Sequence, residues 1–231
     1  MATFARRRGF SVEILDANAE ALDATAAAER ITARAPRLAA IVVYGHNPSA
    51  SIQVMPAAGA IARTLKERAR GQPLLFVGGY VAALPERTLR EEAADFACSG
   101  EGPITVAELL AALAAGDDLG SVRGLVFRDG AETRTNPPAP LILDLDADMP
   151  GVAWDLLPMA AYRAHNWHCF GEPSRTPYAA LYTTLGCPFH CTFCCIQAPF
   201  RAGERALGMR PGSSSSAAGA RRASSPRSTP S

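Results

Sequence analysis

Three cysteines near the end of the chain have types and spacing that could do chemistry. They lie in the run Cys187-Pro-Phe-His-Cys191-Thr-Phe-Cys194. Thiolates are soft ligands, and iron–sulfur clusters are held by cysteine sulfur. A loop this short can place three thiolates around one corner of a [4Fe–4S] cluster. One iron then stays open to a small molecule.

Zinc binding, disulfide bonding and burial in a core are the alternative interpretations. Zinc sites favour two pairs of closely spaced cysteines, or added histidines at a set spacing. His190 lies inside the loop, but no second cysteine pair follows it. Cys195 comes directly after Cys194, so its side chain is expected to point elsewhere. We interpret it as structural, with a ligand role as the alternative.

The elements that must position this loop indicate an α/β fold. The apolar run 179–185 directly precedes the cysteines and predicts a strand. Upstream, apolar runs typical of strands buried on both faces alternate with stretches of helical pattern. The predicted strands are 11–15, 38–44, 74–77 and 95–98. The predicted helices are 3–9, about 18–33, about 52–70 with the inner stripe Ile52, Met55, Ile61 and Leu65, about 85–93, and 105–114.

This alternation predicts a Rossmann-like parallel sheet with right-handed crossovers. Ligands bind such sheets beyond the carboxyl ends of the strands. Three small, glycine-rich loops follow predicted strands and therefore share one rim, where glycine lets backbone approach a ligand closely. Each loop alone is explained by a tight turn, but three together favour a ligand site. The candidate binding residues are Gly45, His46, Ser49, Ser51, Gly78, Gly79, Tyr80, Gly100, Glu101 and Gly102.

Several of these residues have a structural alternative. His46 can serve loop hydrogen bonding as well as a cofactor. Glu101 is also interpretable as a carboxylate stabilised by the start of a helix. Cys98, at the end of a predicted strand, is expected to be a small core residue.

After the predicted sheet the pattern changes. Residues 122–135 predict a β-hairpin with an Asp-Gly turn. Residues 136–160 are rich in proline and predict an interdomain linker, pinned to a domain by Trp154, Leu156 and Leu157. Histidines, Trp167 and Cys169 cluster within 165–170. We interpret them first as packing residues; the second interpretation is that they line a cavity, and the third is a metal site.

Composition limits the function classes. The 231 residues are 48% hydrophobic and carry a net charge of +1, which argues against a general nucleic-acid binder. Six cysteines, four of them within nine positions, are unlike a secreted disulfide framework and suit a reducing cytoplasm. No apolar run approaches the roughly 20 residues of a membrane span, and the start of the chain is unlike a signal peptide.

The order of sheet, hairpin, proline-rich linker and cysteine loop resembles that of radical S-adenosylmethionine (SAM) enzymes with an N-terminal cobalamin (B12)-binding domain. The resemblance covers most of residues 5–212. The cysteine loop is its specific part, and the other segments support it together. Those segments are 43–51, 77–86, 99–102 and 153–158.

The resemblance implies that Cys187, Cys191 and Cys194 hold a [4Fe–4S] cluster whose open iron binds SAM, with Phe193 near the adenine. It implies that the rim loops contact cobalamin. The second domain would be a partial (β/α) barrel, with the cluster loop after its first strand. The implied domains are 1–118 for cobalamin, 119–160 for hairpin and linker, 161–212 for the start of the barrel, and 213–231 for a disordered tail.

The implied reaction is reductive cleavage of SAM, with methyl transfer to an unactivated carbon or phosphorus of a small-molecule or natural-product substrate. Flavodoxin or ferredoxin would supply the electron, and neither nucleic acid nor membrane would be a partner. Two departures from the family stand out. Tyr80 replaces the histidine that often follows Gly78-Gly79, and the Asp-x-His-x-x-Gly signature of histidine-ligated cobalamin proteins is absent.

Two rival functions remain open, a cobalamin carrier and a small iron–sulfur electron-transfer protein. The tail from Ser213 has no large apolar residue and is expected to be disordered. The chain also starts inside a predicted helix and holds one barrel strand. We therefore expect a truncated or frame-shifted family member, diverging near Ser213, that does not cleave SAM productively.

Overall fold

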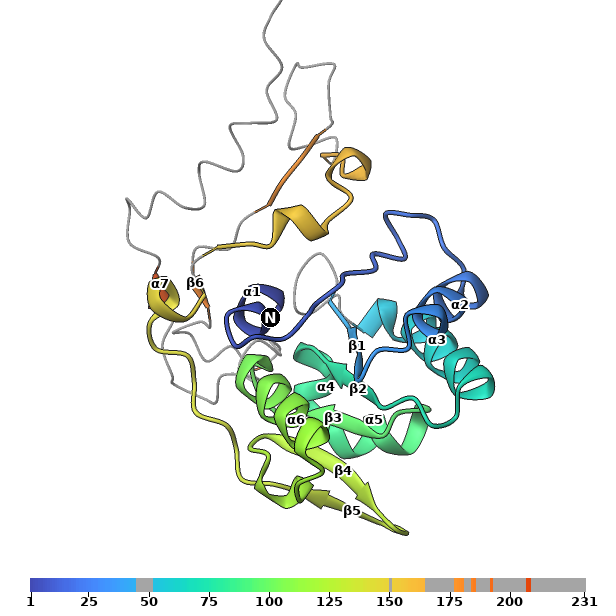
Figure 1. The fold of residues 1–231 in the computed structure, drawn as a ribbon, viewed down its shortest axis with the longest axis vertical. Coiled ribbons are helices and arrows are strands. Elements are labelled where there is room, and N and C mark those ends of the chain that lie inside the picture. The colour runs from blue at the N-terminus through green and yellow to red at the C-terminus, as the bar shows by residue number, and fades with distance from the viewer. Residues whose placement is uncertain are drawn as a thin grey trace, which may run out of the picture.

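A five-stranded sheet organises the molecule, as Figure 1 shows for the computed structural model. The structure describes residues 1–44, 52–149, 151–164, 177–180, 184–185, 192 and 207–208. The strands lie side by side in chain order. They are β1 (Ala39–Val42), β2 (Leu74–Val77), β3 (Phe96–Cys98), β4 (Leu125–Asp129) and β5 (Glu132–Thr135).

The sheet is mixed, because its first three strands are parallel and its last two are antiparallel. Ala39 of β1 pairs with Leu74 of β2, and Cys98 of β3 pairs with Leu125 of β4. The predicted α/β fold is thus confirmed. The hairpin that the sequence placed after residue 118 extends the same sheet, because β4 forms an antiparallel ladder with β3.

Helices connect and cover the strands. They are α1 (Ala2–Arg6), α2 (Ala24–Arg34), α3 (Met55–Arg68), α4 (Gly79–Ala83), α5 (Pro85–Glu91), α6 (Pro103–Ala115) and α7 (Leu145–Asp148). Short 3₁₀ turns follow at Leu119–Ser121, Trp154–Leu156 and Met159–Ala161. A separate antiparallel pair joins β6 (Thr184–Leu185) to β7 (Leu207–Gly208).

Strand β2 shows why both faces of the sheet must be covered. All four of its residues are buried. Leu74 and Phe76 belong to one core with Leu65 of α3, and Leu75 and Val77 belong to a second core on the α6 side. Side chains of a strand alternate between faces, so a wholly apolar strand needs a helix on each side.

Two predicted elements differ at the start of the chain. Residues 11–15 are not a strand, although their side chains alternate, because within the described chain they pair with no neighbouring strand. The helix predicted from about 18 begins only at Ala24. Ala21 has a φ of +51°, which interrupts helical backbone, and the Asp23 carboxylate caps the helix by accepting a hydrogen bond from Ala26 N at 2.8 Å.

Three further differences concern the middle of the chain. Ile52, predicted on the inner stripe of a helix, is 55% exposed because α3 itself starts at Met55. Residues 79–83 form α4, where the sequence suggested only a loop. The 136–160 segment contains α7 and two 3₁₀ turns, and Figure 1 shows it running from the hairpin past α1 to the opposite end of the molecule.

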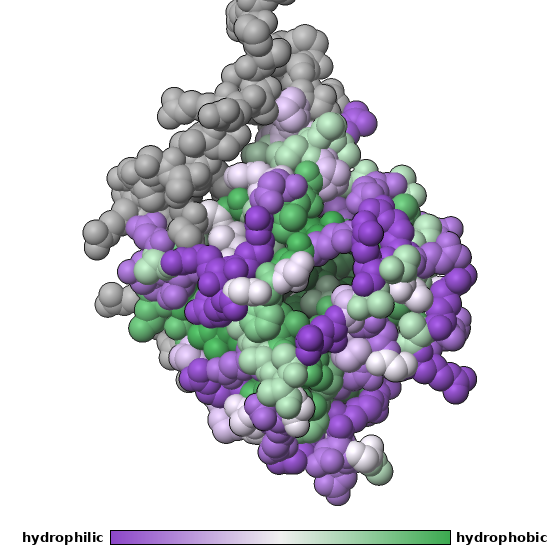
Figure 2. All heavy atoms as spheres, viewed as in Figure 1, coloured by the Kyte–Doolittle hydropathy of each residue, from purple (hydrophilic) through white to green (hydrophobic). Residues whose placement is uncertain are grey.

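On one face of the molecule, apolar and charged residues lie in separate regions. Figure 2 shows apolar side chains gathered in a band down the middle of the face, with a hollow near its centre and charged residues on both flanks. Among the described residues, no helix combines the length and the apolar character needed to cross a membrane.

Candidate functional site

The carboxyl ends of β2 and β3 meet at one edge of the sheet. Both strands are parallel and adjacent, so the segments that follow them, 78–80 and 100–102, lie on a common rim, as predicted. Each segment opens a helix, α4 after β2 and α6 after β3. Parallel α/β sheets bind ligands at this edge.

Gly78 brings the end of β2 very close to β1. Its φ is +145°, and a Cβ atom there would stand 2.1 Å from the carbonyl oxygen of Val43. The adjacent bond from Val43 N to Val77 O measures 2.7 Å. Gly102 has a φ of +100°, and its Cβ would meet Val77 Cγ1 at 2.9 Å. Only glycine fits this conformation and spacing.

The other two rim glycines face open space. A Cβ atom at Gly79 or at Gly100 would meet no described atom within 4 Å. Beside them, at the end of β1, Val42 is 53% exposed and Tyr44 is 44% exposed. Gly79 is itself buried and Gly100 is half-buried, so the rim offers room for atoms at these two positions, next to exposed apolar side chains, which suits an organic ligand that packs against the backbone.

Two predicted rim residues have structural partners. The Glu101 carboxylate accepts a hydrogen bond from Ile142 N at 2.7 Å, so it holds the segment that follows the hairpin. Tyr80 lies in α4 and packs partly buried against the core on the α3 side of the sheet.

The remaining predicted site residues lie outside the described residues. They are Gly45, His46, Ser49 and Ser51 of the first rim loop, the motif residues Cys187, Cys191, Phe193 and Cys194, and also Cys169, Cys195 and the tail 213–231. Within the described parts of the chain, no group of three His, Cys, Asp or Glu side chains could hold a metal ion.

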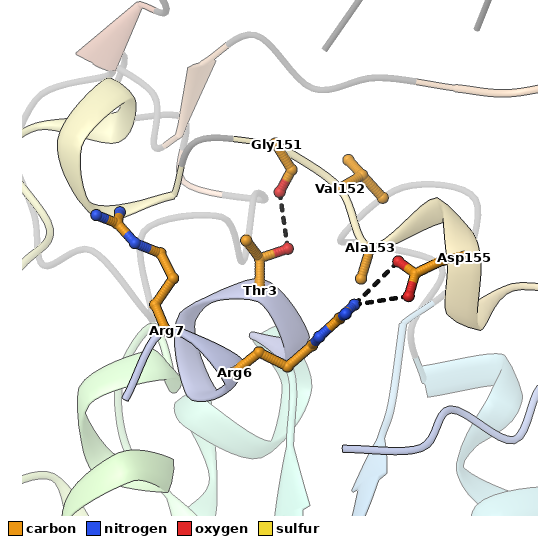
Figure 3. Close-up of a pocket in the computed structure, with 7 residues that line it drawn as sticks. All are labelled: Thr3, Arg6, Arg7, Gly151, Val152, Ala153 and Asp155. Carbon is orange, nitrogen blue, oxygen red and sulfur yellow. Dashed lines mark hydrogen bonds and ion pairs between the residues drawn. The ribbon is translucent and has the colours of Figure 1, made fainter. Parts of the chain in front are cut away.

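A cavity of about 290 Å³ lies where α1 meets the segment after α7. Figure 3 shows Arg6 pointing to Asp155, with both carboxylate oxygens within 2.9 Å of its Nη1. The Thr3 hydroxyl donates to the Gly151 carbonyl at 2.9 Å, and Arg7 donates to the Ala147 carbonyl. These contacts therefore fasten the predicted linker to the N-terminal helix. They could not be predicted from the sequence of the linker.

A further contact joins the residues before α2 to the residue that follows the last 3₁₀ turn. The Tyr162 hydroxyl donates a hydrogen bond of 2.7 Å to Asp16 Oδ2, across 146 residues of sequence. Burial, and then the bond to Asp16, raise the pKa of the Tyr162 phenol. No local sequence pattern indicates that Tyr162 and Asp16 form a hydrogen bond, and the sequence analysis did not predict it.

Cys98 behaves as the sequence predicted. It is fully buried at the end of β3, and its thiol is free. Burial raises the pKa of the Cys98 thiol, which therefore stays protonated and is a poor metal ligand or nucleophile.

Comparison with known families bears on this edge of the sheet. Residues 1–110 match the family described as "B12 binding domain", a match that includes the rim segments 78–80 and 100–102. The strand-end glycines thus lie in the part of the chain that the family match defines.

Two curated proteins are similar to part of this chain. An uncharacterized methyltransferase, PH0819 of Pyrococcus horikoshii, is 33% identical over 147 residues, which are 63% of this chain and 30% of that protein. The anaerobic magnesium-protoporphyrin IX monomethyl ester cyclase of Synechocystis is 30% identical over 155 residues, 67% of this chain and 29% of that protein. The chain spans less than a third of either relative.

A solved structure shares the fold. The radical SAM methyltransferase TsrM from Kitasatospora setae, with cobalamin and a [4Fe–4S] cluster bound, superimposes with a TM-score of 0.63 at 18% identity. The match covers 90% of this chain and 39% of TsrM. A second TsrM structure, with tryptophan and a SAM analogue, gives a TM-score of 0.61 at 19% identity.

Proposed function

We propose that this chain binds cobalamin along the carboxyl edge of its sheet and belongs to a cobalamin-dependent radical SAM enzyme, with methyl transfer as its reaction class. The observation that carries the cobalamin part is the rim itself. Glycine-rich turns follow two adjacent parallel strands, inside the segment that matches the B12-binding family.

The residues proposed to hold cobalamin are those of the two rim segments that follow β2 and β3. In the described chain these are Gly78, Gly79, Tyr80, Gly100 and Gly102. The loop residues Gly45, His46, Ser49 and Ser51 are proposed to complete the rim after β1. Glu101 is proposed to support the rim without touching the cofactor, because its carboxylate accepts a hydrogen bond from Ile142 N.

The proposal extends to the cysteine motif. Cys187, Cys191 and Cys194 are proposed to hold a [4Fe–4S] cluster, with Phe193 beside the adenine of SAM. When bound, the cluster and SAM supply one-electron chemistry, and cobalamin supplies a carrier for the methyl group. The protein's own part is to orient these groups and to exclude water. The name of one curated relative, an uncharacterized methyltransferase, supports a methyltransferase class. The proposed partners are a small-molecule substrate and a flavodoxin-like or ferredoxin-like electron donor.

Titration with hydroxocobalamin tests the rim. Saturable binding is expected, and Gly79→Trp should weaken it at least about tenfold, because the indole fills space that a ligand must occupy. Thr135→Val is the control, because it removes a hydroxyl that bonds Glu86 at 2.9 Å on the hairpin and changes no residue of the rim. Folded wild-type protein that binds no hydroxocobalamin overturns the cobalamin proposal.

Anaerobic reconstitution with iron and sulfide tests the cysteine motif. About four irons per chain are expected, the content of one cubane cluster, and added SAM should change the EPR spectrum of the reduced cluster. Replacement of Cys187, Cys191 and Cys194 by alanine should abolish loading, whereas replacement of Cys169 should not. A triple variant that keeps the same cluster would show that other residues hold it.

A further inference from the structure

The second rim segment, 100–102, is flanked by two side chains that carry a hydroxyl group. Ser99 directly precedes the segment, and Thr105 lies in the first turn of α6, which follows it. The Ser99 hydroxyl donates to the Gly124 carbonyl at 3.1 Å. The Thr105 hydroxyl donates to the Arg123 carbonyl at 2.8 Å. Two consecutive residues just before β4, which we call the hairpin entry, therefore hold the chain on both sides of the rim segment.

Ser99 binds the hairpin entry with its backbone as well. Its N–H donates to the same Gly124 carbonyl oxygen at 2.9 Å, directly after the last ladder pair of β3 and β4, Cys98 with Leu125. A carbonyl oxygen has two lone pairs, so it can accept both bonds. The contact between the two strands thus continues to the residue before Gly100, and the Ser99 side chain reinforces its end.

Gly124 lies very close to Thr105. Its φ is +71°, and a Cβ atom there would stand 2.7 Å from Thr105 Oγ1. Glycine therefore lets the hairpin entry approach the first turn of α6. Thr105 is fully buried, so its bond to the Arg123 carbonyl satisfies a hydroxyl that water does not reach.

The hairpin entry is itself held in place. Gly124 N donates to the Pro137 carbonyl at 2.7 Å. Arg123 N and Nε donate to the two carboxylate oxygens of Glu108, which lies on α6, each at 2.8 Å. Both residues that accept the hydroxyl bonds are therefore fixed to their surroundings, and they can fix the rim segment in turn.

One further bond lies within the turn after β3. The Cys98 thiol donates to the Gly100 carbonyl at 3.6 Å, and Cys98 is fully buried. A Cβ atom at Gly100 would meet no described atom within 4 Å. The carbonyl oxygen of Gly100 is thus used within the fold, whereas the position of its missing side chain stays open.

We propose that Ser99 and Thr105 are positioning residues for the cobalamin site, because their bonds to the hairpin entry fix the rim segment 100–102 in the conformation that receives the cofactor. This inference rests on the proposed cobalamin site. Each hydroxyl acts through the segment between the two residues and need not touch the cofactor. The β4–β5 hairpin then helps to shape the rim, although it lies beyond the residues 1–110 that match the B12-binding family.

Hydrogen exchange of the full chain without ligand tests the positioning itself. Ser99→Ala removes the hydroxyl and keeps the backbone bond, and the amides of 100–102 should exchange about fivefold faster than in the wild type, the effect of one lost hydrogen bond. Ser99→Thr keeps a hydroxyl and should exchange near the wild-type rate. Ser121→Ala is the matched control, because it removes a serine hydroxyl that bonds the Asp118 carbonyl at 2.9 Å, away from the rim.

Titration with hydroxocobalamin tests the consequence for the site. Ser99→Ala should weaken binding about twofold to fivefold, because the cofactor must order a segment that the hydroxyl no longer holds. Thr105→Val, which removes the other hydroxyl and nearly keeps the shape of the side chain, should weaken binding in the same direction, and Thr105→Ser should restore it. Ser121→Ala should bind like the wild type. Circular dichroism checks that each variant is folded.

The two readouts separate the possible failures. Wild-type protein that binds no hydroxocobalamin overturns the proposed function, and the positioning role with it. Normal wild-type binding with unchanged affinity in Ser99→Ala overturns the positioning role alone, whatever the exchange rates. Weaker binding without faster exchange of 100–102 also overturns it, because the hydroxyl would then act on the cofactor directly. Faster exchange together with weaker binding in Ser99→Ala, both restored in Ser99→Thr, supports the proposal.

Discussion

Gly78 shows how a single residue shapes the candidate site. Its positive φ turns the chain at the end of β2, and the absence of a side chain lets Val43 O approach to a distance that no Cβ tolerates. The two parallel strands can then end at the same level, which creates the rim. This feature was predictable from the sequence, because a glycine directly follows a predicted strand.

Gly78→Ala should destabilise the fold strongly. The added methyl group would clash with the Val43 carbonyl and would sit on backbone that L-residues rarely adopt, so we expect a loss of about 2–4 kcal/mol in the free energy of unfolding. Urea denaturation followed by circular dichroism measures it. Gly79→Ala is the control, with an expected change below about 0.5 kcal/mol. Equal stability of the two variants would contradict the close approach.

Residue-scale prediction failed where contacts are distant in sequence. Asp16 and Tyr162 are separated by 146 positions, and each is unremarkable in its own segment. The same holds for Arg6 and Asp155, whose ion pair fastens the segment after α7. A local pattern reports helix or strand preference, and it carries no information about which distant side chain will be a partner.

At the scale of elements, the strands with continuous apolar runs were predictable. Residues 74–77 are apolar throughout, and only a strand covered on both faces accommodates them. Residues 11–15 failed because alternation indicates a strand only where a neighbouring edge is available to pair with. Helix α4 was missed because it is five residues long and begins at a glycine, a weak helix former.

Glu101 makes a prediction at this scale, because it couples the start of α6 to the segment after the hairpin. Glu101→Ala removes the acceptor for Ile142 N, so the amide of Ile142 should exchange about fivefold to tenfold faster. Hydrogen exchange measured by NMR or mass spectrometry reports it. Glu101→Gln keeps an acceptor oxygen and is the control. Unaltered exchange at Ile142 in the alanine variant would show that other contacts hold this segment.

At the scale of the whole molecule, the segment between Ile142 and Tyr162 is fastened to the start of α6, to helix α1 and to the residues before α2. Glu101 holds Ile142, Thr3 holds Gly151, and Asp16 holds Tyr162. The sequence predicted the rim and its glycines, and a linker pinned to a domain by Trp154, Leu156 and Leu157, but it did not predict the hydrogen bonds that fasten this segment. Its contacts depend on helix α1 and on residues before α2, which only the folded chain brings near.

The most direct test of cobalamin binding at this edge is a crystal structure of the full chain with hydroxocobalamin, with anomalous data collected at the cobalt absorption edge. Binding at the rim predicts a cobalt peak beyond the carboxyl ends of β2 and β3, with the corrin ring against the backbone of Gly79 and Gly100. A cobalt peak on any other surface, with the rim free of ligand density, would contradict it.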